Sequence, residues 1–194
     1  LGLEIIPYGI TQSSKVYDEE KAEYSSASSM DLGFDLNYNI TSQLKASITY
    51  NTDFAQTEVD NRQINLTRFP LRFPEKRDFF LEGSSILEFA PSSNVDPYFS
   101  RRIGLVNGIP IPIKYGGRLI GNIGKSNIAL LHVRTGREGE LNPENFSVAR
   151  YRRNFWKESS IGLIYTHRST EDDILFGNPI QDRNTWGTDL NLST

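Results

Sequence analysis

Apolar and polar residues alternate with a period of two along much of this chain. In the segment "MDLGFDLNYNIT" (30–41) every second residue is apolar, and "QLKASITYNTDF" (43–54) repeats the pattern. A period of two is typical of a β-strand with one apolar face. Because only a short connection separates the two segments, they are predicted to form a β-hairpin.

Six further segments show strand patterns, which makes eight predicted strands in all. They span residues 1–12, 113–124, 127–135, 146–155, 159–168 and 185–193. Most of the eight are about 9 to 12 residues long, whereas strands of soluble proteins average about five or six. Strands that cross a membrane need about 9 to 11 residues. The lengths therefore favour membrane-spanning strands.

Long and tight connections alternate between the predicted strands. The long ones are 13–28, 55–112, 136–145 and 169–184, and the tight ones are 41–42, 125–126 and 156–158. In an up-and-down sheet, alternate connections lie at the same end, so one end collects every long loop. Outer-membrane β-barrels have short periplasmic turns and long extracellular loops, whereas a Greek-key sandwich has no reason for this parity. The chain is predicted to be an all-β, antiparallel, up-and-down transmembrane β-barrel fragment of about eight strands.

The second face of the predicted strands is polar or small, which suits the aqueous lumen of a barrel. Candidate lumen-wall residues are Asp35, Lys45, Lys114 and Arg118. The strand 146–155 fits this scheme poorly, because Arg150 and Arg152 share a face with Val148. Aromatic residues near the strand ends, such as Tyr50 and Tyr165, are consistent with girdles at the two lipid interfaces.

The alternation fails between residues 55 and 112, which we predict to be a folded insertion between strand regions 1–54 and 113–194. Acidic and basic residues are equally numerous there, and many aromatics argue against disorder. The sequence leaves three roles open: a lumen plug whose charges select solutes, a structural brace, or a substrate-binding site. The candidate plug charges are Arg68, Arg72, Glu75, Lys76, Arg77, Glu82, Arg101 and Arg102.

The size of the insertion limits where it can lie. An eight-stranded barrel has an interior just wide enough for side chains. Either the barrel continues beyond residue 194 or the insertion caps the outside. We expect the chain to be a piece of a longer polypeptide and to have the remainder of its own chain as a partner.

Composition excludes several classes of function. The net charge of −3 and the pI near 5.5 argue against nucleic acid as a partner, because phosphate recognition needs a basic excess. The chain has no cysteine and no His or carboxylate pattern with metal-ligand spacing, so no metal and no cofactor are predicted. Carboxylate pairs such as Glu75 with Asp78 have basic neighbours and are better explained as ion pairs than as a glycosidase acid and base. No catalytic residue is predicted, and a non-enzymatic role is favoured.

Three stretches carry a resemblance to a known family: residues 53–83, "YFSRRIG" (98–104) and the hairpin 111–136. They resemble the DUF5916 proteins of Gram-negative bacteria, particularly Bacteroidota. That family is similar to outer-membrane β-barrels preceded by a carbohydrate-binding family 9-like domain, which is not in this chain.

The resemblance implies a bacterial outer-membrane location, lipid as a partner, and a channel, transport or surface-binding role. The expected ligand is a glycan or small solute taken up as a nutrient. The alternative is a soluble β-rich carbohydrate-binding or glycan-hydrolase domain.

Overall fold

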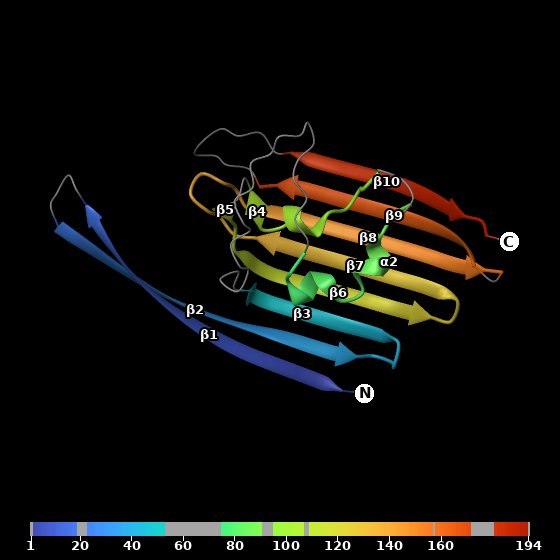
Figure 1. The fold of residues 1–194 in the computed structure, drawn as a ribbon, viewed down its shortest axis with the longest axis horizontal. Coiled ribbons are helices and arrows are strands. Elements are labelled where there is room, and N and C mark those ends of the chain that lie inside the picture. Colours follow the sequence, from blue (N-terminus) through green and yellow to red (C-terminus); the bar gives the residue numbers. More distant parts are fainter. Residues whose placement is uncertain are drawn as a thin grey trace.

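A computed structural model of the chain describes residues 2–18, 23–52, 75–90, 95–106, 109–156, 158–171 and 181–193. Eight long strands dominate it (Figure 1). They are β1 (Leu3–Asp18), β2 (Glu23–Asn39), β3 (Leu44–Thr52), β6 (Ile113–Ile123), β7 (Ser126–Thr135), β8 (Glu144–Phe155), β9 (Ser159–Thr170) and β10 (Asp182–Asn191).

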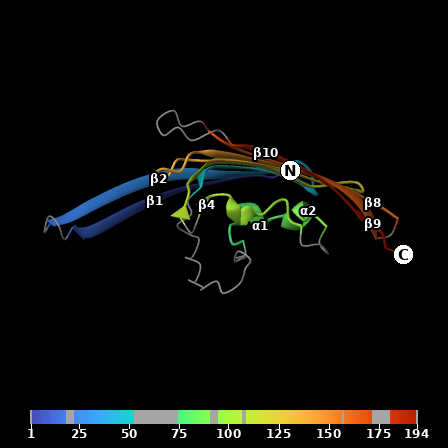
Figure 2. The same cartoon turned by 90° about the horizontal axis from the view of Figure 1, so that it is seen from above.

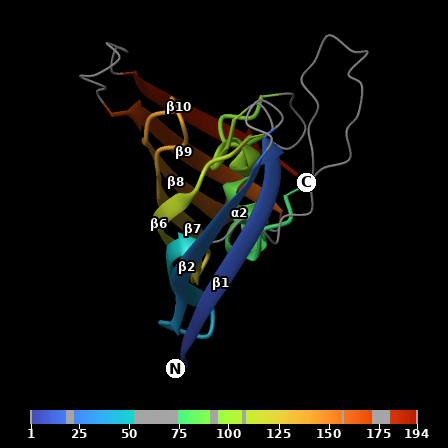
Figure 3. The same cartoon turned by 90° about the vertical axis from the view of Figure 1, so that its left-hand side faces the viewer.

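The eight strands form one antiparallel sheet in the order β1-β2-β3-β6-β7-β8-β9-β10. Each strand pairs with its neighbour in this up-and-down sequence, so the predicted all-β fold of eight antiparallel strands is confirmed. The predicted closure is not seen among the described residues: β1 and β10 are open edges with one paired neighbour each. Figure 3 shows these two edges on opposite sides of the inserted segment.

The first hairpin corrects one sequence prediction. Residues 13–28 were expected to be a long loop, but β1 and β2 stay paired as far as Asp18 and Glu23. This segment is rich in serine, whose small side chain gives no apolar and polar alternation to read, while its backbone pairs as well as any other. The strict alternation of long and tight connections therefore fails at its first member, although in Figure 1 the end of β1 and the start of β2 lie on the same side of the sheet as the end of β3.

The segment 55–112, called the insert from here on, folds into short elements. They are α1 (Asp78–Leu81), α2 (Ser84–Leu87), the 3₁₀ helix η1 (Ser100–Arg102) and a small hairpin of β4 (Leu105–Val106) and β5 (Ile109–Pro110). Figure 2 shows α1 and α2 on the concave side of the curved sheet. No helix in the described part of the chain is long and apolar enough to span a membrane.

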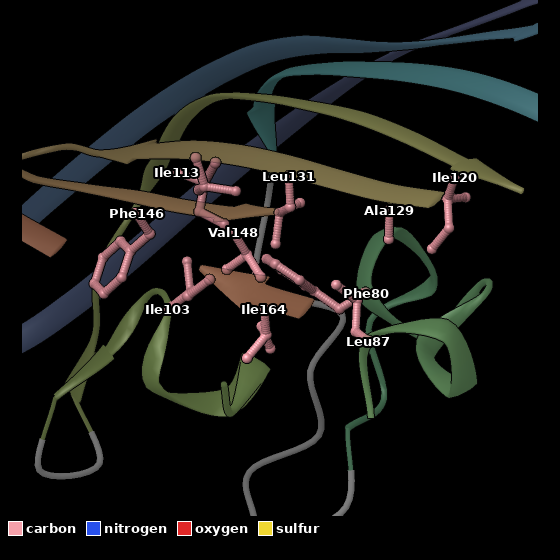
Figure 4. Packing of buried hydrophobic residues seen from close by; sticks show 11 residues of the cluster. Phe80, Leu87, Ile103, Ile113, Ile120, Ala129, Leu131, Phe146, Val148 and Ile164 are labelled. Atoms are coloured by element: carbon pink, nitrogen blue, oxygen red, sulfur yellow. The ribbon is translucent and has the colours of Figure 1, made fainter. Parts of the chain in front are cut away.

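The insert and the sheet share one hydrophobic core, shown in Figure 4. Phe80, Leu87 and Ile103 of the insert pack against buried apolar residues of β6 to β9. The sheet residues are Ile113, Ile120, Ala129, Leu131, Val133, Phe146, Val148 and Ile164. The face they occupy is called the inner face. It was expected to be polar throughout, but beneath the insert it is apolar, because there it faces protein.

Candidate functional site at the contact between insert and sheet

Glu82, at the C-terminal cap of α1, is held by two cations of the sheet. Lys45 on β3 donates to both carboxylate oxygens, with Nζ 2.9 Å from each. Arg118 on β6 donates from Nη2 to Oε2 at 2.5 Å. The same Nη2 also donates to the Ser47 hydroxyl at 3.2 Å. We call these four residues the Glu82 clamp; it joins a predicted plug charge to two predicted wall residues.

Arg118 also fixes the backbone of α1. Its Nη1 donates to the carbonyl oxygens of Phe79, at 2.5 Å, and of Glu82, at 3.0 Å. The guanidinium carbon lies 5.2 Å from the centre of the Phe79 ring, within cation–π range. One buried arginine therefore holds a backbone turn, an aromatic ring and a carboxylate of the insert against β6.

Gly83 makes the close approach of α1 to β6 possible. Its φ of 68° lies in the left-handed region, where a residue with a Cβ is strained. A Cβ at this position would lie 2.7 Å from Cδ1 of Ile120. The sequence "LEGSS" thus turns from α1 into α2 while the backbone stays in contact with the sheet.

A second ion pair lies deeper under the insert. Arg150 on β8 makes two hydrogen bonds to Asp189 on β10, of 2.6 Å and 2.8 Å, and its side chain has no exposed surface. The Phe89 ring lies 5.5 Å from the guanidinium carbon, and the Ala90 backbone N–H donates to Asp189. The insert therefore covers this pair and contributes a donor to it. In the sequence, Arg150 did not fit the alternation of its strand because it shares a face with Val148. The structure shows that its partner on that face is Asp189.

Glu75 and Arg77, both predicted plug charges, pair with each other inside the insert. Arg77 donates from Nε and Nη2 to the two oxygens of Glu75, each at 2.7 Å. It also donates to the carbonyl oxygens of Ser100 and Ile103, at 2.8 Å and 2.6 Å. Arg77 thus ties the start of α1 to the η1 turn and serves the internal structure of the insert.

The remaining predicted site residues are not brought into the clamp. Lys76 and Arg102 are exposed, and Arg101 is buried, where desolvation lowers its pKa. Lys114 lies beside Gly136 at an irregularity of β6 and is exposed. Asp35 lies on the inner face of β2, opposite Thr49. Arg68 and Arg72 lie outside the described residues.

The electrostatics of the clamp stabilise the ionised form of Glu82. Partial burial acts to raise its pKa, but the hydrogen bond from Lys45 and the charge of Arg118 outweigh it, so the pKa lies below the ordinary 4.5. For Glu75, too, burial acts to raise the pKa while the hydrogen bond and charge of Arg77 lower it, and the net result is a pKa below the ordinary value. No group of three His, Asp or Glu suited to a metal ion occurs in the described ranges.

The attachment of the insert should depend on pH only in acid. A carboxylate whose pKa is lowered by folding adds stability above its unfolded pKa, and this stability is lost as the pH falls through the folded value. We expect a constant melting temperature from pH 7 to about 5 and a fall below about 4.5. Because Glu82 is half-exposed, its own share should be under about 1 kcal/mol. Melting curves of Glu82→Gln against wild type check this share: the two curves should converge in acid, and parallel curves would contradict it.

The outer face of the sheet, opposite the insert, is apolar and exposed. Tyr38, Ile48, Leu130 and Leu163 all lie on it, since paired and alternate residues share a face. Its exposed large apolar residues, called the outer belt, are Leu3, Ile5, Leu32, Phe34, Tyr38, Ile48, Tyr50, Tyr115, Leu130, Tyr151, Ile161, Leu163, Trp186 and Leu190. A patch that crosses a whole sheet exceeds the scattered apolar residues of an ordinary soluble surface.

Comparison with known families decides the family assignment. The model of a domain of unknown function, DUF5916, matches residues 1–111, which include β1 to β3 and nearly all of the insert. The chain belongs to the DUF5916 family. The first hairpin, β3, α1 and Glu82 therefore lie within the matched part of this DUF5916 chain, while Arg118, Arg150 and Asp189 lie beyond it. No curated protein matches the chain significantly, and neither does any solved structure.

Proposed function

We propose that this DUF5916 chain is part of an outer-membrane β-barrel whose lumen side carries the insert. The observation that supports this most strongly is the outer belt, because an exposed apolar face on one side of a sheet suits contact with lipid. Strands β6 to β10 are 10 to 12 residues long, near the length that crosses a bilayer. The free edges of β1 and β10 would pair with further strands, as a sheet in lipid requires.

The slope of the outer belt is a second supporting feature. Aromatic residues along one edge of the belt are Tyr50 on β3 and Trp186 on β10, and the Trp186 ring lies 4.1 Å, centre to centre, from the tilted ring of the neighbouring Tyr165. Along the hydrogen-bond ladder, Tyr50 aligns successively with Tyr115, Arg134, Asn145, Ser169 and Asp182. Trp186 lies four residues further along β10 than Asp182.

This displacement has a simple geometric meaning. At about 3.3 Å per residue and about 4.8 Å per strand, four residues over five strand steps tilt the belt by roughly 30° from the perpendicular to the strands. Strands in membrane barrels tilt by about 35–45°. If these strands were tilted in a membrane as barrel strands are, the aromatic edge would therefore lie nearly parallel to the membrane plane.

The position of the insert bears on its role. The insert packs on the face opposite the outer belt, and the Glu82 clamp attaches it to the polar part of that face. This arrangement supports a plug or brace within the barrel over an external cap. In a barrel wide enough to hold it, the insert would restrict what passes. We therefore propose a channel, transport or surface-binding component for a nutrient such as a glycan.

An arginine on the outer belt tests the membrane proposal. We expect Leu130→Arg to destabilise the protein in lipid by about 2–4 kcal/mol, as a charge facing the bilayer midplane does. The matched control is Asn145→Arg, on the same face but beyond the belt, where little change is expected. The measurement is urea unfolding of the full-length protein in vesicles. Equal stability of the two variants, with wild type folded in buffer without detergent, would instead favour the soluble carbohydrate-binding or glycan-hydrolase alternative.

A further inference from the structure

The donors of the Glu82 clamp form a cradle for a carboxylate on the inner face of the sheet. Lys45, Ser47 and Arg118 come from the paired strands β3 and β6, where Ser47 is directly opposite Arg118. Lys45 and Arg118 both donate to the Glu82 carboxylate, which enters from the insert. The Ser47 hydroxyl accepts from Arg118 and donates to Asn37, so it holds the guanidinium in place. The sheet therefore supplies the donors of the cradle, and the insert supplies the carboxylate that now occupies it.

The two sides of this contact differ in burial. The Arg118 side chain is 3 % exposed and that of Lys45 is 26 % exposed, whereas 47 % of the Glu82 side chain is exposed. Glu82 caps a helix of four residues, which is too short to be stable by itself. The carboxylate can thus leave with a small rearrangement, while the donors stay where the sheet holds them.

The cradle has more donor capacity than Glu82 uses. The buried Nε of Arg118 has no hydrogen-bond partner within the described residues. Lys45 carries three N–H donors, and among the described residues its ammonium group hydrogen-bonds to the two Glu82 oxygens. An unused buried donor is unfavourable, so Glu82 does not fully satisfy the Arg118 guanidinium.

We propose that Lys45 and Arg118, with Ser47 holding the guanidinium, form an anion-binding site for a carboxylate-bearing solute, which Glu82 occupies as an internal substitute ligand. An arriving carboxylate would take over the hydrogen bonds from Lys45 and Arg118 and free Glu82 at the end of α1. Charge-assisted bonds to arginine suit this exchange, because the planar guanidinium presents its donors to a carboxylate in a fixed geometry. The inference depends on these contacts alone and not on a membrane location.

Removal of the internal ligand should reveal the site. Acetate is the probe, since it carries the same group as the Glu82 side chain. In Glu82→Ala, acetate should raise the melting temperature in a saturable way and bind at least about tenfold more tightly than in wild type, given the strength of charge-assisted bonds. Chloride at equal ionic strength should have no such effect. The measurement is thermal melting and titration calorimetry on the full-length protein in detergent solution.

The matched control is Glu171→Ala. Glu171 also pairs with an arginine, Arg134, but both side chains are partly exposed and, in the described part of the chain, no second cation contacts the Glu171 carboxylate. Acetate should leave this variant unchanged. An equal response of both variants, or no response of either, would overturn the proposal. If Glu82→Ala fails to fold, Glu82→Gln keeps an oxygen for Lys45 and Arg118 and should still bind acetate more tightly than wild type.

A double variant separates a specific site from general charge effects. Adding Lys45→Met to Glu82→Ala should weaken acetate binding at least about tenfold, because one of the two cations is lost. Unchanged acetate binding in the double variant would also overturn the proposal. This result is independent of the Leu130→Arg test, so either proposal can fail while the other stands.

Discussion

Asp189→Ala is expected to lower the free energy of unfolding by about 3–5 kcal/mol, because it leaves a buried arginine without its partner. The Arg150 side chain is completely buried, and two hydrogen bonds to Asp189 satisfy its terminal nitrogens. Phe89 and Ala90 of the insert lie directly over the pair. The loss should therefore also loosen the insert. Urea unfolding and limited proteolysis of the insert measure the two effects.

Two variants make this prediction specific. Asp182→Ala removes an exposed carboxylate from the same strand and should change stability by less than about 0.5 kcal/mol. Arg150→Met combined with Asp189→Leu replaces the pair by apolar groups and should recover most of the lost stability, since a buried ion pair is often no better than packed apolar side chains. A double variant as unstable as Asp189→Ala would show that the packing, and not the orphaned charge, is responsible.

Phe80→Ala should destabilise the protein by about 3–5 kcal/mol, the usual range for a buried phenylalanine. Phe80 is 4 % exposed and lies in the core between insert and sheet. It meets the Phe79 ring edge to face at 5.1 Å, and the Arg77 guanidinium lies 4.1 Å from its ring centre. The variant removes apolar packing and the surface on which Arg77 rests, so the insert should detach before the sheet unfolds. Chemical denaturation with proteolysis of the insert provides the measurement.

Leu81→Ala is the control for Phe80→Ala. Leu81 follows Phe80 on α1 but is 42 % exposed, and its truncation should change stability by less than about 1 kcal/mol. On the proposed function, a detached insert no longer restricts the lumen, so Phe80→Ala should also raise ion conductance in planar lipid bilayers. Lower stability with unchanged conductance would support the role of the insert as a brace and contradict its role as a plug.

The sequence pointed to the charged residues of the Glu82 clamp but did not predict the pairing of Arg150 with Asp189. Lys45 and Arg118 were found because they stand on the polar side of alternating strands, and Glu82 because it lies in the segment where alternation fails. Arg150 broke the pattern of its strand, which was the one available signal. Its partner could not be found, because the pairing depends on β8 and β10 flanking β9 and on the insert covering both.

The bounds of the strands could also be predicted only in part from the sequence. Alternation located β3 and β6 to β9 closely, since each has clear apolar and polar positions. It missed residues 13–18 and 23–28, where serine-rich sequence pairs through its backbone alone. Pattern recognition depends on side-chain contrast, whereas strand pairing depends on backbone hydrogen bonds.

The sequence by itself determined the antiparallel order of the eight strands and the place of the insert, because period-two patterning and connection length are local properties of the chain. Only the tertiary structure decided which face the insert covers. That choice makes Ile120, Leu131 and Val148 a protein core and leaves Ile48 and Leu130 exposed. All five are equally apolar in the sequence, and their environments differ because the insert packs on one side of a sheet whose alternate residues point in opposite directions.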